Sequence, residues 1–112
     1  MYEENKIVCI TLYNGNQIIG RYRQYTFDVE GNLKTFTINY PKPVFISQDK
    51  AGNTNMGLGD MIGKPKGNLT LKGQDIFNTY EVDDIGLLDL YYKSTSGLTL
   101  APLNFNPKKE MN

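Results

Sequence analysis

The sequence predicts an all-β fold, a small and strongly bent antiparallel barrel of five strands. Apolar residues alternate with polar ones in several short runs, which is the period of a half-buried strand. Turns rich in glycine, proline and asparagine separate these runs, and no long run has a helical period. In a chain of 112 residues, a barrel is the economical way to leave few sheet edges exposed.

The first two strands are expected to form a hairpin. Residues 6–12 alternate, and Tyr13-Asn14-Gly15-Asn16 then supplies residues that tolerate the positive φ of a tight turn. The second strand runs from about Gln17 to Phe27 and contains Gly20. A glycine inside a strand marks a bend or a close backbone approach, so Gly20 favours a barrel.

The third strand begins at Leu33 and alternates as far as Pro41-Lys42-Pro43, where we expect an edge or a bulge. A long insertion over about residues 47–84 is predicted next, because its first part is rich in glycine and has little periodicity. Residues 69–84 fit a short strand followed by either a helical turn or another strand.

A closing hairpin completes the predicted barrel. Residues 85–92 are rich in leucine and tyrosine, a polar turn follows, and residues 98–103 alternate again. We therefore predict strands 4 and 5 here, a single domain over residues 1–104, and a polar C-terminal tail over residues 105–112.

The composition argues against an enzyme. The chain has no histidine, and its one cysteine, Cys9, lies in an apolar strand pattern where a buried structural thiol is expected. It therefore lacks the usual general base near neutral pH and most transition-metal ligands. The acids at 75–84 match no calcium loop and favour a solvated turn. We predict no catalytic residues, no metal and no cofactor.

The charges balance, since lysine plus arginine and aspartate plus glutamate both count 12. They are segregated along the chain: residues 34–72 are rich in lysine, whereas residues 73–92 carry acids and no base. Both runs are either solvated faces or faces that pair between subunits. The start of the chain lacks a basic leader region, and no apolar stretch in the sequence is long enough to span a membrane, which predicts a cytoplasmic protein without membrane contact.

Two stretches resemble the motifs of Sm/LSm proteins. Gly15, Gly20, Phe27-Asp28 and Asn32-Leu33 occur in the order in which a turn glycine, a strand glycine, an aromatic–Asp pair and an Asn–Leu pair recur in the first motif. Residues 86–102 resemble the second motif. Within it, Tyr92-Lys93 is similar to the Tyr-Lys-His opening of the Hfq branch, with Ser94 at the histidine position, whereas the Sm branch has Arg-Gly.

The resemblance implies a homo-oligomeric ring that binds single-stranded nucleic acid, RNA in preference to DNA, around a pore. Strand 4 of one subunit, Ile85–Lys93, would pair with strand 5 of the next, Leu98–Leu103. The long insertion also resembles Sm-like proteins of phage origin. The residues that the resemblance assigns to nucleic-acid binding are Asp28, Asn32, Tyr92, Lys93 and Ser94. Arg21 and Arg23 fall on one face of the second strand and are secondary candidates for phosphate contacts.

Each of these residues also has a purely structural interpretation. Asp28 and Asn32 are the residue types of a hydrogen-bonded turn, and Tyr92 is suited to core or interface packing. Arg21 and Arg23 are compatible with simple solubility. The alternative function is therefore a structural or assembly protein, such as a phage particle component, that uses the barrel only for protein contacts.

Overall fold

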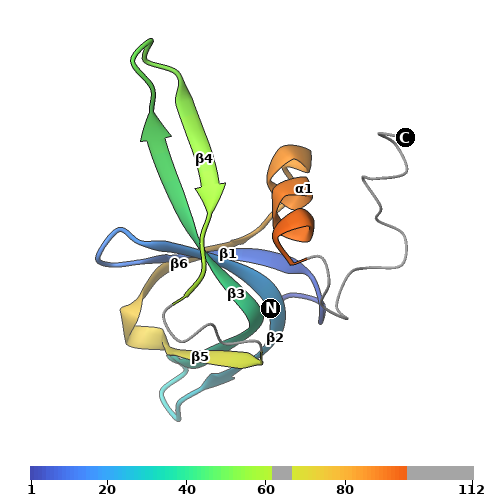
Figure 1. Ribbon diagram of the computed structural model, residues 1–112. Helices are drawn as coiled ribbons and strands as arrows, with labels where there is room; N and C mark the ends of the chain where they lie inside the picture. The colour runs from blue at the N-terminus through green and yellow to red at the C-terminus, as the bar shows by residue number, and fades with distance from the viewer. Residues whose placement is uncertain (62–66, 96–112) are drawn as a thin grey trace.

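The computed structural model describes residues 1–61 and 67–95, which form a strongly bent antiparallel sheet with one helix on its outer face (Figure 1). The strands occur in the order β4-β3-β2-β1-β6, and β5 also pairs with β3. The elements are β1 (Ile7–Leu12), β2 (Gln17–Phe27), β3 (Leu33–Gln48), β4 (Thr54–Leu58), β5 (Asn68–Lys72), the 3-10 turn η1 (Gly73–Asp75), β6 (Ile76–Glu81) and α1 (Ile85–Ser94).

Strand β3 has 16 residues and connects the parts of the sheet. It pairs with β2 along one edge and with two further strands in succession along the other. Its first half pairs with β5, and its second half pairs with β4. Between them the chain bends at Tyr40, whose φ of 50° is unusual for a residue other than glycine. Residues 44–58, called the arm below, project from the barrel as a two-stranded hairpin (Figure 1).

Both faces of β1 are buried, which places it at the centre of the molecule. On the concave face, Val8 and Ile10 pack with buried residues of β2 and β3, among them Tyr22, Phe36 and Ile38. On the other face, Ile7 and Cys9 pack under α1. Successive strand residues point to opposite faces, so one alternating segment serves both apolar clusters.

Helix α1 closes the convex face of the sheet. Asp84 caps its start by accepting a hydrogen bond from the Leu87 N–H at 2.9 Å. Leu87 and Tyr91, one turn apart, are its buried residues. The Tyr91 hydroxyl donates to the Tyr40 carbonyl at 2.9 Å, so the helix also holds the bend of β3.

The all-β prediction and the first hairpin are confirmed. The observed β1 and β2 match the expected segments, and Gly20 lies where β2 passes close to β3: a Cβ there would be 2.7 Å from Cδ1 of Ile38. The third strand starts at Leu33 as predicted but continues through Pro41 and Pro43. It can do so because, among the described residues, no strand pairs with residues 40–43 on the side away from β2.

The second half of the barrel was predicted wrongly. Residues 85–93 form α1, not strand 4, and residues 98–103, predicted as strand 5, lie outside the described residues, as does the predicted tail. Residues 47–84 are not a simple insertion, because they include β4, β5 and β6, which give the described sheet six strands. A run rich in leucine and tyrosine is apolar at either period, so the pattern alone could not separate helix from strand.

Candidate functional site

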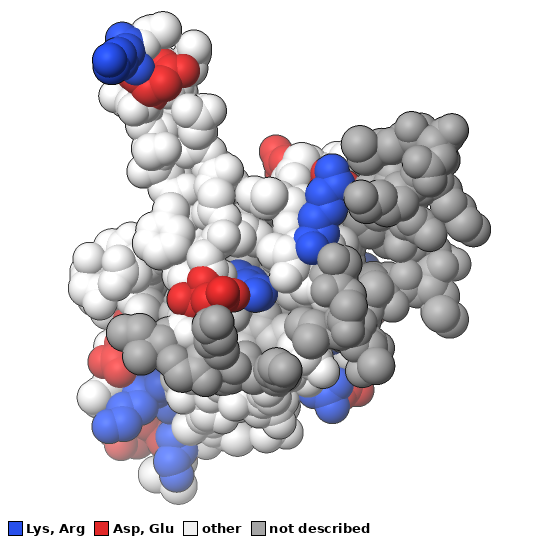
Figure 2. Space-filling model, viewed as in Figure 1, with Lys and Arg blue, Asp and Glu red and all other residues white. Residues whose placement is uncertain are grey.

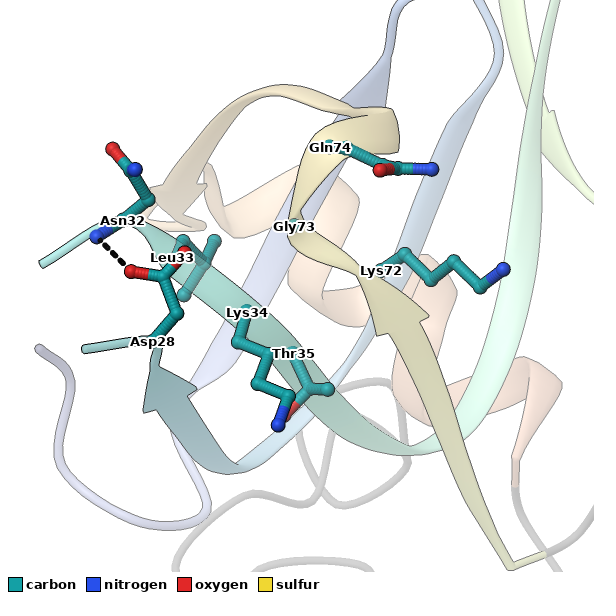
Figure 3. A pocket seen from close by; sticks show the side chains of 8 residues that line it. All are labelled: Asp28, Asn32, Leu33, Lys34, Thr35, Lys72, Gly73 and Gln74. Atoms are coloured by element: carbon teal, nitrogen blue, oxygen red, sulfur yellow. Dashed lines mark hydrogen bonds between the residues drawn. The ribbon is translucent and has the colours of Figure 1, made fainter. Parts of the chain in front are cut away.

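A groove lies where the β2–β3 turn meets η1 (Figure 3). The pairing of β5 with the first half of β3 places Lys72 opposite Thr35, and this register brings the two turns together. The groove has a volume of about 840 Å³. The residues that line it are Asp28, Asn32, Leu33, Lys34, Thr35, Lys72, Gly73 and Gln74.

Asp28 and Asn32, two predicted site residues, are brought together in this groove. Asp28 Oδ1 accepts hydrogen bonds from the backbone N–H groups of Glu30 and Asn32, both at 2.9 Å. Gly31 occupies the position of positive φ, at 87°. The Asn32 side-chain amide points away from the Asp28 carboxylate, toward solvent (Figure 3). The carboxylate therefore braces the turn, and the Asn32 amide lies at the edge of the groove, directed away from the other labelled side chains (Figure 3).

Gly73 permits the close approach that forms the groove. A Cβ at Gly73 would overlap the carbonyl group of Leu33, so η1 can pass β3 only because this residue has no side chain. On either side of that contact, the exposed Lys34 and Lys72 contribute two positive charges against the one negative charge of Asp28. The Gln74 side chain adds an amide with both a donor and an acceptor (Figure 3).

Lys34, Lys72, Gly73 and Gln74 were missed as site residues. A signal for them existed, because Lys72-Gly73 follows the alternating run Leu69-Thr70-Leu71. The sequence interpretation instead placed the second motif at Tyr92-Lys93, which lies in α1.

The three predicted residues of α1 are not part of this groove. Figure 1 shows α1 beside the arm, while the β2–β3 turn lies at the far end of the sheet. Lys93 forms an ion pair with Asp89 at 2.9 Å, one turn earlier in the helix. The Ser94 hydroxyl donates to the Tyr91 carbonyl at 2.8 Å. Tyr92 is half-buried, and burial raises the pKa of its hydroxyl.

Arg21 and Arg23 also lie outside the groove. The Arg23 guanidinium is 3.0 Å from the Glu4 carboxylate and donates to Oδ1 of Asn5 at 3.3 Å. Arg21 lies opposite Ile7 of β1, which packs in the apolar cluster under α1, so Arg21 belongs to the side of the sheet that α1 covers. The predicted site residues therefore fall into two separate regions of the molecule.

Cys9 is buried beneath α1, as predicted for a structural thiol. Burial raises its pKa, and its contact with Tyr80 raises the pKa of that hydroxyl to about 12, so both groups stay protonated at neutral pH. Within residues 1–61 and 67–95, no cluster of three or more histidine, cysteine or acidic side chains is arranged to hold a metal ion. In the same part of the chain, no helix is long and apolar enough to cross a membrane.

Comparisons with known proteins find structural likeness without sequence relatives. No protein family matches the sequence, and no curated protein is similar to it. A heptameric archaeal Sm protein is 19% identical to this chain, with a TM-score of 0.40. The alignment covers 70% of this chain and 87% of the archaeal chain. The SmAP1 heptamer of P. aerophilum is also 19% identical, with a TM-score of 0.41 over 71% of this chain and 82% of its own. Neither comparison bears on a phage origin.

Proposed function

We propose that this protein binds single-stranded nucleic acid, RNA in preference to DNA, without catalysing a reaction, and that it acts in the cytoplasm as a ring of identical subunits. The observation that carries the proposal is the groove between the β2–β3 turn and η1. Its lysines, Lys34 and Lys72, suit phosphate oxygens, and the amides of Asn32 and Gln74 suit the edges of unpaired bases.

A ring would compensate for the lack of net charge. On the face shown in Figure 2, basic and acidic side chains lie next to one another and do not gather into one basic surface. One subunit therefore attracts a polyanion weakly. Several copies of Lys34 and Lys72 around one axis would act on the same strand, and multivalent contact raises affinity without a positive total charge.

The edges of the sheet support self-association. Strand β6 ends the strand order, and β5 pairs only with β3, so each has an edge without a neighbouring strand among the described residues. Exposed edges promote pairing with other chains. Pairing of β5 in one subunit with β6 in the next would satisfy both edges and close a ring. This seam replaces the one predicted at 85–93 and 98–103.

The decisive experiment measures the binding of fluorescent oligo(U), oligo(A) and the matching DNA strands by anisotropy at several salt concentrations. We expect binding that weakens as salt rises, because phosphate contacts release counterions. Lys72→Ala and Lys34→Ala should each weaken binding several-fold and reduce the salt dependence. Lys50→Ala, in the turn between β3 and β4, is the matched control and should have no effect.

Absence of binding to every oligonucleotide at low salt would refute the nucleic-acid proposal. Light scattering of the same samples tests the ring separately, since it measures mass without ligand. Substitution of Thr70 by proline would remove a backbone donor from β5, and a mass that falls to that of one subunit would support the β5–β6 seam. A wild-type protein that is already monomeric would exclude it.

A second function is favoured by the arm. Phe45 and Ile46 are each 60% exposed and Met56 is 48% exposed, although all three are large and apolar. A projecting two-stranded hairpin has little stability of its own, and such side chains often mark a protein contact. A structural or assembly protein would use this surface, and ring formation without nucleic-acid affinity would favour that function.

A further inference from the structure

We infer that Tyr13 and Phe77 form a stacking platform for one base of the same strand, beside the groove described above. This inference rests on the proposed nucleic-acid function and adds a second position to it. Tyr13 is 70% exposed and Phe77 is 62% exposed, although each is a large ring in contact with the other. They come from different elements, since Tyr13 follows β1 and Phe77 belongs to β6.

The two rings meet edge to face. Their centroids are 5.5 Å apart and their planes meet at 76°, so one ring stands edge-on to the other and its faces are not covered by its partner. The Tyr13 N–H donates to the Asp75 carbonyl at 3.1 Å, which fixes the tyrosine backbone against η1. The register of β1 against β6 shifts between Thr11 and Leu12, next to the position of Phe77. Phe77 follows the buried Ile76 along β6, so its ring lies on the exposed side of the strand.

The platform is continuous with the groove. A pocket of about 300 Å³ lies beside Tyr13 and is lined by Leu12, Asn14, Gln74 and Asp75 as well. Gln74 lines both this pocket and the larger groove. A strand whose phosphates contact Lys72 can therefore pass over Gln74 and place a neighbouring base against the aromatic pair.

The side chains of this pocket suit a base and not a phosphate. Among the described residues that line it, Asp75 alone is charged, and a carboxylate repels phosphate but accepts hydrogen bonds from the amino group of a base. Asn14 Oδ1 accepts from the Asn16 N–H at 2.9 Å, which holds the side chain in the turn. Gln74 offers a donor and an acceptor in one plane, the pattern that matches adenine. We therefore expect a preference for bases with an exocyclic amino group, adenine above uracil.

The test compares oligo(A) and oligo(U) affinity in three variants by fluorescence anisotropy, with light scattering on every sample. Phe77→Leu and Tyr13→Leu keep apolar bulk but remove a ring, and each should weaken oligo(A) binding about tenfold, because stacking on a protein ring contributes strongly per base. The loss should be smaller for oligo(U). Phe45→Leu, an exposed aromatic of the arm, is the matched control and should bind as the wild type does.

The outcomes separate this inference from the proposed function. If the wild type binds and Lys72→Ala weakens it, while Phe77→Leu and Tyr13→Leu leave both affinities unchanged, the platform is refuted and the groove stands. If the wild type binds no oligonucleotide, both fail. If the ring variants change the mass of the assembly while affinity per subunit is unchanged, the pair is a contact between subunits, and the stacking role is refuted.

Discussion

Two turns of this protein have the same sequence pattern and very different surroundings. Residues 28–32 and residues 49–53 both read Asp-x-x-Gly-Asn. In each, the Asp side chain accepts hydrogen bonds from the N–H groups two and four residues later, all at 2.9 Å. The glycine has a φ of 87° in the first turn and 86° in the second. The pattern therefore specifies a hairpin turn in both places.

The turns differ in what lies beside them. The turn at 28–32 lies against η1 and lines the groove with Lys34 and Lys72. The turn at 49–53 forms the tip of the arm, away from the barrel (Figure 1). The Asp–Asn pair thus has a complete structural explanation without any ligand. A binding role for the first turn depends on its neighbours, which the pairing of β5 with β3 supplies.

Gly73→Ala should have the largest effect, because it disturbs the contact with η1 that distinguishes the turn at 28–32 from the turn at 49–53. The new methyl group would overlap the Leu33 carbonyl, and the backbone would have to move to admit it. We expect a loss of about 3 kcal/mol in the free energy of unfolding, measured by urea denaturation. Gly57→Ala, whose added Cβ would meet open space in the arm, is the control and should change stability little. Equal stability of the two variants would show that η1 does not press on β3.

Gly31→Ala and Gly52→Ala should then show how alike the turns are. Both glycines have positive φ and open space around the Cβ position, so the cost comes from the backbone alone. We expect each to lower the free energy of unfolding by about 1 kcal/mol. Oligonucleotide binding should weaken only in Gly31→Ala. A loss of affinity in Gly52→Ala as well would mean that the arm belongs to the binding surface.

Asp28→Asn and Asp49→Asn should separate charge from turn geometry. An asparagine keeps an acceptor oxygen for the two N–H groups and removes the negative charge. Without that charge near Lys34 and Lys72, the groove should bind oligonucleotides about twofold more tightly at low salt. The same change at Asp49 should leave affinity unchanged, as measured by anisotropy. Tighter binding in both variants would indicate a general charge effect and not a local one.

The sequence predicted correctly those elements whose local pattern is compatible with only one structure. Alternation around Val8 and Ile10, the Asn-Gly turn, the close backbone approach at Gly20 and the turn at 28–32 were all predicted, because each depends on the local period or on a glycine. The bend of β3 at Tyr40 was not predicted. It depends on the change from β5 to β4 as partner and on a hydrogen bond from Tyr91, 51 residues away, neither of which leaves a local trace.

The candidate site was predicted in part for the same reason. Asp28 and Asn32 were found through an ordered local motif. Lys72 and Gly73 were missed, because strand β5 is short and the apolar run at 85–93 offered a more conspicuous place for a strand. Helix α1 is defined by its cap at Asp84 and by burial of residues on one side, and burial cannot be seen in the sequence.

The smallest expected effect concerns the pKa of Asp49, in the turn at 49–53. Hydrogen bonds, first that from the Asn53 backbone N–H, hold the pKa of Asp49 below its usual value of 3.8. A carboxyl whose pKa is lowered by folding stabilises the turn above its unfolded pKa, and that contribution disappears as the pH falls through the folded pKa. Carbon-13 NMR should therefore show Asp49 protonating at a lower pH than a free aspartate, with the amide signals of Ala51 and Asn53 moving at the same pH. Asn53→Ala keeps the backbone donor and should retain most of the shift. Titration of Asp49 at its usual pKa in the wild type would mean that the second turn is not formed in solution, and its likeness to the turn at 28–32 would then be one of sequence alone.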